Sequence, residues 1–308
     1  MRDSKEYVVI TGLCGRLGRV LAKELHRTHN IIALDRRPFP NKPKDILHFR
    51  LDIRRKKCEE IFRKFNVTAV IHMGIMHDPR MDAEEHHSWN VTGTERILSY
   101  VEKYNVRKLV ILSSSNVYGP RPLNTHFLKE DAPLLGGERF GDIRDLIIVD
   151  MYANSFFWKF PHIETVILRP VHIVGSVKNA PSNYLRLNRI PTVLGYDPLV
   201  QIIHEQDVVR AMIRSLSKGV KGVFNITGPT EVPLSVLVNK TGKRRIPVPG
   251  VIFDLGMTFM WKFRITSFPP PEVDHLRYLC MVDGSRAAEL LGFRAEKGID
   301  YILKSLAN

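Results

Sequence analysis

Three glycines near the start of the chain, Gly12, Gly15 and Gly18, lie between two stretches of different character. Residues 8–10 form a short apolar run that is typical of a buried strand, and apolar side chains at helical spacing follow at 20–25. Because glycine has no Cβ, the strand can turn sharply into a helix, and a diphosphate group can approach the free N–H groups at the helix N-terminus. The pattern predicts a site for the diphosphate of a dinucleotide.

The carboxylate of Asp35 supplies a second part of this chemistry. It ends the apolar run at 31–34, about where a carboxylate accepts hydrogen bonds from an adenosine ribose. Such a carboxylate repels a 2′-phosphate, which favours NAD. Arg16, Arg36 and Arg37 are close by, and arginines in these places can hold a 2′-phosphate, so NADP stays an alternative.

Alternating strands and helices must position these residues. This alternation implies right-handed crossovers and predicts a Rossmann-type, doubly wound parallel sheet with helices on both faces. The chain then becomes richer in proline, which fits a small C-terminal substrate-binding lobe. We expect a dinucleotide-binding domain at 1–175 and mainly the substrate lobe at 176–308, whose late elements are free to return to the main sheet. The expected strands are 7–11, 31–34, 47–51, 68–72, 108–113 and 165–168, and the expected helices are 16–28, 56–65, 82–104 and 145–160.

Composition narrows the class of protein. The chain has 308 residues, a net charge of +14 and 44% hydrophobic residues. Its basic residues are spread in small clusters without interleaved aromatics, so we expect solvated basic faces and no nucleic-acid partner. It has no apolar run long enough for a membrane span, and its start does not read as a signal peptide. The three scattered cysteines favour a reducing, cytoplasmic location.

Further motifs follow the expected strands in order. Four motifs end expected strands: Asp52-Ile53, His72-Met73-Gly74, the run SSSNVYG at 113–119 and Leu168-Arg169-Pro170. Asn90 in NVTGT sits on the helix after the fourth strand. Together they resemble the extended short-chain dehydrogenase/reductases, the NAD-dependent epimerase/dehydratase group, over nearly the whole chain.

The resemblance implies a set of cofactor contacts. The glycine turn would hold the diphosphate, Asp35 the ribose, and the motifs at the later strand ends would flank the adenine and line the cleft as far as the nicotinamide. The implied cofactor-binding residues are Gly12, Leu13, Cys14, Gly15, Arg16, Leu17, Gly18, Asp35, Arg36, Asp52, Ile53, His72, Met73, Gly74, Asn90, Pro170 and His172.

The resemblance also implies a catalytic tyrosine with a lysine four residues later and a serine at the end of the fifth strand. Ser114 matches the serine position, with Ser115 beside it. The expected tyrosine position falls at Asp142 and the lysine position at Leu146, so this pair is missing. Acid–base substitutes within reach are Asp142 and His77, with Arg144 and Asp145 nearby.

Two functions remain open. One is an NAD-dependent oxidoreductase or epimerase that acts on a small polar substrate such as a sugar nucleotide, without the usual tyrosine. The other is a dinucleotide-binding sensor or scaffold without turnover, which the missing pair favours.

Three other features lead to further expectations. The helix expected at 147–160 is apolar on most of its circumference, which predicts a homodimer through that helix. Adjacent His86 and His87 are expected on different faces of a helix, and no spacing gives a metal site. The Met- and aromatic-rich segment 248–268 is typical of a core helix or an interface in the lobe. Alternatively, it contacts a membrane or covers an apolar substrate.

Overall fold

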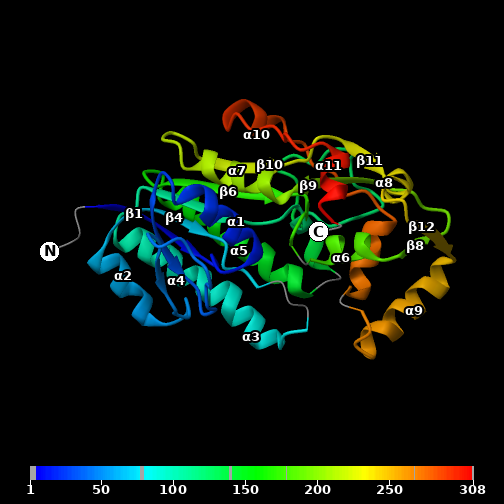
Figure 1. The fold of residues 1–308 in the computed structure, drawn as a ribbon, viewed down its shortest axis with the longest axis horizontal. Coiled ribbons are helices and arrows are strands. Elements are labelled where there is room, and N and C mark those ends of the chain that lie inside the picture. The colour runs from blue at the N-terminus through cyan, green and yellow to red at the C-terminus, as the bar shows by residue number, and fades with distance from the viewer. Residues whose placement is uncertain (1–4, 77–79, 139–140, 178, 267, 307–308) are drawn as a thin grey trace.

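The centre of the molecule is a seven-stranded parallel sheet with the strand order β10-β6-β5-β4-β1-β2-β3 (Figure 1). The computed structural model describes residues 5–76, 80–138, 141–177, 179–266 and 268–306, with residues 141 and 142 as backbone. The prediction of a doubly wound parallel sheet is confirmed. The strands are β1 (Glu6–Thr11), β2 (Asn30–Leu34), β3 (Leu47–Phe49), β4 (Asn66–His72), β5 (Lys108–Leu112), β6 (Glu164–Pro170) and β10 (Gly222–Ile226).

Helices cover both faces of this sheet because its strands are apolar on both sides. In β1 every residue from Tyr7 onward is buried, and alternate side chains enter two separate cores. One core contains α1 (Arg16–Leu25) and α7 (Glu205–Ser215). The other contains α2 (Glu59–Lys64), α4 (Gly93–Lys103) and α5 (Gly141–Lys159).

The expected elements are present with altered bounds. The helix expected at 82–104 is divided into α3 (Ala83–His87), a π-helical turn at Ser88–Thr92 and α4. The helix expected at 56–65 begins as a 3-10 turn at Lys56–Cys58. Strand β3 is two residues shorter than expected, whereas β6 extends to Pro170. A π-turn adds a residue to a helical turn and is often associated with functional positions; here it contains Asn90.

Residues after β6 build the lobe and also complete the main sheet. A three-stranded sheet contains β7 (His172–Val174), β9 (Leu199–His204) and β11 (Glu231–Pro233), and a two-stranded one contains β8 (Arg189–Val193) and β12 (Arg244–Val248). Their helices are α6 (Ala180–Arg186), α8 (Leu234–Lys240), α9 (Gly250–Lys262) and α11 (Ile299–Lys304). In contrast, α7, β10 and α10 (Ser285–Leu290) pack in the core of the main sheet. Part of 176–308 therefore belongs to the main sheet and its covering helices.

Helix α5 is buried on one side only. Val149, Ala153 and Phe156 pack in the core, whereas Met151 is 56% exposed and Trp158 76% exposed. The homodimer stays a prediction, and this outer side is the surface available for it. Among the described helices, none combines the length and the apolar character that crossing a membrane requires.

Candidate active site

The glycine turn connects β1 to α1. Gly12 has a φ of +75°, and a Cβ at this position would lie 2.7 Å from the Gly74 Cα. A Cβ on Gly18 would lie 2.4 Å from the Leu13 oxygen. Gly15 is the N-cap of α1 and offers no side-chain cap, and the first turn carries no acidic residue. The first N–H groups of α1 are therefore left for an external anion.

Asp35 lies directly behind this turn and is 4% exposed. It accepts hydrogen bonds from the Cys14 backbone N–H (3.0 Å), the Arg37 backbone N–H (2.9 Å) and the Arg37 guanidinium, whose Nη2 is 2.8 Å away. Burial alone would raise the pKa of Asp35, but hydrogen bonds and charge from Arg37 outweigh it and lower the pKa. The carboxylate is thus ionised and already shared with Arg37, a contact that sequence reasoning missed.

One arginine predicted near the adenosine, Arg36, lies together with Arg54 beside an aromatic ring. The Arg36 guanidinium lies 4.5 Å and that of Arg54 5.1 Å from the ring centroid of Trp89. The indole N–H of Trp89 donates to the Gly74 oxygen at 2.7 Å. Asp52 accepts from Arg54 at 2.7 Å. Trp89 was not predicted, although it directly precedes Asn90 in the NVTGT motif.

His72 is buried in a chain of hydrogen bonds behind the cleft. The Thr11 hydroxyl is 2.7 Å from its Nδ1, and its Nε2 is 2.9 Å from the Thr94 hydroxyl. The Thr94 hydroxyl donates to the backbone oxygen of Asn90, and the Gly74 backbone N–H donates to the Thr11 hydroxyl. The Thr11 hydroxyl therefore donates to Nδ1 of His72, and Nε2 donates to the Thr94 hydroxyl. The imidazole carries its single proton on Nε2. Burial lowers the pKa of His72 to about 4, so the ring is neutral. Its side chain positions the ends of β1 and β4.

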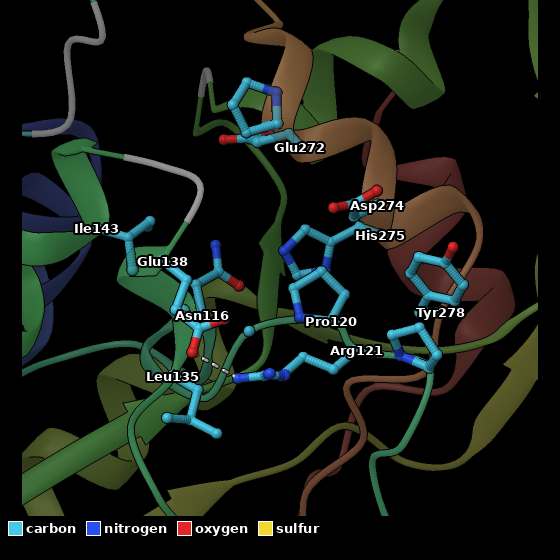
Figure 2. A pocket seen from close by; sticks show the side chains of 14 residues that line it. Asn116, Pro120, Arg121, Leu135, Glu138, Ile143, Glu272, Asp274, His275 and Tyr278 are labelled. Carbon is cyan, nitrogen blue, oxygen red and sulfur yellow. Dashed lines mark ion pairs between the residues drawn. The ribbon is translucent and has the colours of Figure 1, made fainter. Parts of the chain in front are cut away.

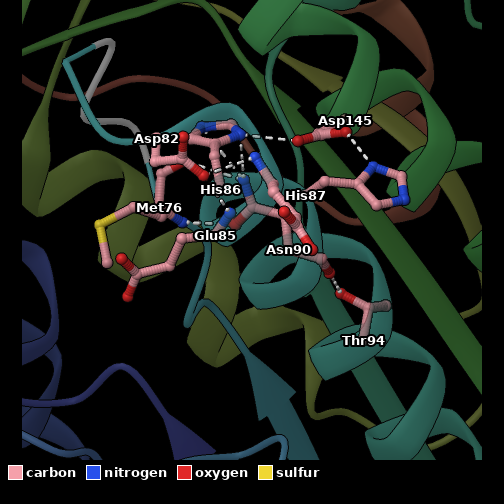
Figure 3. A network of polar contacts seen from close by, with 9 residues as sticks. Met76, Asp82, Glu85, His86, His87, Asn90, Thr94 and Asp145 are labelled. Atoms are coloured by element: carbon pink, nitrogen blue, oxygen red, sulfur yellow. Dashed lines mark hydrogen bonds and ion pairs between the residues drawn. The ribbon is translucent and has the colours of Figure 1, made fainter.

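Asn90 fixes the loop that follows β4 (Figure 3). Its side-chain oxygen accepts from the Met76 N–H at 2.7 Å, and its amide donates to the Met76 oxygen at 3.0 Å. Met73 and Gly74 belong to the same loop. The Asn90 side chain on the π-turn therefore fixes the backbone of the loop after β4.

His86 and His87 share one carboxylate (Figure 3). The Nδ1 atom of each lies 2.7 Å from a different oxygen of Asp145 on α5. The two side chains differ in exposure, 3% for His86 and 54% for His87, so they lie on different faces as expected, yet both rings reach the carboxylate of Asp145. Among the described residues, no group of three or more His, Cys, Asp or Glu side chains is arranged to hold a metal.

The three serines after β5 differ in exposure. Ser113 is buried and donates to Asp150 at 2.6 Å, and Ser115 is 3% exposed. Ser114 is half-buried and accepts from the Asn116 N–H at 3.2 Å. Of the predicted pair, Ser114 is the more exposed residue.

A cavity opens beside Asn116, between the loop after β5 and the lobe (Figure 2). Arg121 and Glu138 form an ion pair of 3.0 Å on its wall, and His275 faces it from the 3-10 segment Pro270–Leu276. Further lining side chains include Ile143, Glu272, Asp274 and Tyr278. Sequence reasoning missed this set, because the segments that meet here lie far apart in the chain and carry no shared motif.

His172 connects the predicted nicotinamide border with this cavity. Its ring centroid lies 4.9 Å from that of His275, in an edge-to-face contact. Burial lowers the pKa of His172 to about 4, and burial together with the charge of His172 holds the pKa of His275 well below its usual value. Two neutral imidazoles therefore join the strand end after Pro170 to the lobe.

A known protein family matches this arrangement. The sequence model described as NAD dependent epimerase/dehydratase family matches residues 8–227. The chain belongs to this family. Its membership confirms the resemblance and NAD as the class of cofactor.

Individual relatives agree. An uncharacterised protein of Mycobacterium tuberculosis is 29% identical over 257 residues, covering 79% of this chain and 68% of its own. UDP-glucose 4-epimerase of Thermotoga maritima, solved with UDP-glucose, has a TM-score of 0.76 at 19% identity and covers 97% of both chains. dTDP-glucose 4,6-dehydratase of Bacillus anthracis, solved with NAD, has a TM-score of 0.74 at 17% identity, covering 98% of this chain and 96% of its own. These two structures show the same fold.

The glycine turn of this family member fits the diphosphate of NAD, since a Cβ at Gly12 or Gly18 would collide with the backbone of Gly74 or Leu13 and displace the turn, and no side chain caps the N-terminus of α1. Arg16 and Arg37 flank the turn. Arg16 donates to the Ser176 oxygen at 2.9 Å and so connects the turn to the chain after β7. The contacts predicted for the individual cofactor residues stay predictions.

The expected tyrosine and lysine positions lie on α5. Leu146, at the lysine position, is 3% exposed and packs in the core. The side chain of Asp142 and all of His77 lie outside the described residues, so their predicted acid–base roles stay predictions. Asp145, which was considered as a substitute, is held between the two histidines.

Proposed function

We propose that the protein uses bound NAD for oxidoreductase or epimerase chemistry on a small polar substrate of the sugar-nucleotide class. The observation that carries this proposal is the cavity between the loop after β5 and the lobe, whose wall includes Asn116, the residue whose backbone N–H donates to the Ser114 hydroxyl. In doubly wound folds, ligands bind at this carboxyl edge of the sheet. Relatives of the same fold bear the names of UDP-glucose and dTDP-glucose enzymes, which supports this class of substrate.

The lining of the cavity suits a substrate rich in hydroxyl groups. Arg121 and Glu138 supply charges of both signs, and Tyr278 supplies a phenol. Bound NAD supplies the hydride acceptor. The Ser114 hydroxyl would hydrogen-bond the substrate oxygen that reacts, and the neutral His275 ring would accept a hydrogen bond from a substrate hydroxyl. Asp142 and His77 remain the proposed proton acceptors.

The second candidate, a dinucleotide-binding sensor or scaffold without turnover, is favoured by one observation. Leu146 is buried in the core at the expected lysine position, so no cation there lowers the pKa of a neighbouring acid.

One experiment separates the two functions. The purified protein with NAD is mixed with UDP-glucose, dTDP-glucose or UDP-glucuronate, while NADH absorbance is recorded and sugar products are analysed by NMR. We expect reduction or a new sugar with one of them, and on the order of a hundredfold slower reaction for Ser114→Ala. Ser99→Ala, an exposed serine on α4, is the matched control. NAD binding by calorimetry without any conversion would support the sensor or scaffold.

Two further parts of the proposal concern assembly and location. We propose a homodimer through the outer side of α5, where Met151 and Trp158 are exposed. Light scattering of the wild type should give twice the mass of one chain, and that of Trp158→Asp should give the mass of one chain.

A cytoplasmic location fits the free cysteines Cys14, Cys58 and Cys280.

A further inference from the structure

Helix α9 exposes an apolar surface at the rim of the lobe (Figure 1). Only Phe253 and Met257, which are four residues apart, are buried against the lobe. The exposed apolar side chains of the helix and of the residues directly after it, as far as Ile265, form what we term the α9 patch. Its exposed apolar side chains are Val251 (74%), Ile252 (62%), Leu255 (69%), Phe259 (57%), Met260 (37%), Phe263 (59%) and Ile265 (63%).

The rim of the α9 patch is basic. Lys262 ends the helix, and Arg264 follows Phe263 directly; both are exposed. The single acid of the helix, Asp254, is neutralised by Arg277, whose Nη2 lies 2.7 Å away. The patch therefore combines large apolar side chains with uncompensated positive charge, on a chain whose net charge is +14.

We propose that the α9 patch docks the protein on the surface of an anionic lipid bilayer. The charge of Lys262 and Arg264 complements anionic headgroups, and the aliphatic and phenyl side chains fit the boundary between headgroups and acyl chains. A helix of 13 residues is about 20 Å long, shorter than the roughly 30 Å hydrocarbon layer. The helix would lie in the plane of the interface.

Charge also distinguishes this occupant from a second copy of the chain. A two-fold contact through the α9 patch would bury Lys262 and Arg264 of both copies in one interface, and the acid of the helix, Asp254, is already paired with Arg277. Moreover, the residues of α9 do not line the substrate cavity, whereas Glu272 and His275 of the following segment do. The patch is thus separate from the proposed active site.

Vesicle flotation tests the proposal. Full-length protein is mixed with vesicles of phosphatidylcholine alone or with added phosphatidylserine. We expect binding to the phosphatidylserine vesicles that falls at high salt. Leu255→Ser with Phe259→Ser should weaken it on the order of tenfold or more. Lys262→Gln should weaken it about fivefold, and Arg264→Asn by a similar factor; asparagine suits the φ of +58° at Arg264.

Matched variants and defined outcomes keep the test sharp. Leu290→Ser removes an apolar side chain of similar exposure, 60%, from α10, and Arg63→Gln removes an exposed charge from α2. Neither should change vesicle binding. Thermal melting of every variant checks folding. The proposal is overturned if the wild type does not float, if the control variants lose as much binding as the α9 variants, or if light scattering shows that Phe259→Ser abolishes a dimer.

Discussion

Arg169 at the end of β6 and Asp150 in the middle of α5 form a fully buried, bidentate ion pair. Arg169 Nη2 lies 2.6 Å from Oδ1 and Nε 2.9 Å from Oδ2, and neither side chain is more than 1% exposed. Ser113 donates to the same carboxylate, and the Tyr118 hydroxyl lies 2.7 Å from Arg169. The pair therefore fixes α5 against the ends of β5 and β6, where the candidate active site begins.

Removal of one partner should be costly. Arg169→Met leaves the Asp150 carboxylate buried without its counter-ion, so we expect a loss of about 3–5 kcal/mol in the free energy of unfolding, measured by urea denaturation. Arg107→Met breaks the exposed pair with Glu6 and should cost less than about 1 kcal/mol. Equal losses in the two variants would contradict the structural role given to Arg169.

The glycine turn gives a second prediction. In Gly18→Ala the new Cβ would collide with the Leu13 backbone at 2.4 Å, and a backbone atom cannot move aside cheaply. We expect at least tenfold weaker NAD binding by calorimetry, a loss of about 1.4 kcal/mol or more. Gly256→Ala in α9 has open space around it and should bind NAD normally. Unchanged binding by Gly18→Ala would show that the diphosphate does not approach this turn.

The clamp on Asp35 gives a third prediction. Arg37→Ala frees the carboxylate for the ribose hydroxyls and removes a positive charge near the 2′ position. The ratio of NADPH to NADH dissociation constants should therefore rise, on the order of tenfold. Arg63→Ala, on the distant helix α2, should leave the ratio unchanged. A lower ratio in Arg37→Ala would mean that Arg37 does not attract the 2′-phosphate.

The sequence was sufficient for the parts of the site that depend on local rules. The turn at Gly12–Gly18, the alternation of strands and helices and the place of Asp35 each follow from residues that are neighbours in the chain. The clamp of Arg37 on Asp35, the stacking on Trp89 and the pairing of His172 with His275 were missed. These contacts depend on which rotamers and which distant segments meet, and the segment that carries His275 has neither a glycine pattern nor a regular period that would place it.

Histidine titration gives the last prediction. His72 has a pKa of about 4 in the folded protein against 6.5 when exposed, so the folded state binds fewer protons than the unfolded state between these values. Stability therefore falls as pH drops from 6.5 towards 4, by about 2 kcal/mol at pH 5 from this residue alone. His72→Gln should be less stable at pH 7, because it breaks the bonds to Thr11 and Thr94, yet it should lose less stability between pH 7 and pH 5 than the wild type. His126→Gln, an exposed histidine, should keep the wild-type slope in urea denaturation. Identical slopes for the wild type and His72→Gln would mean that the buried ring accepts a proton without disrupting the chain from Gly74 to Asn90.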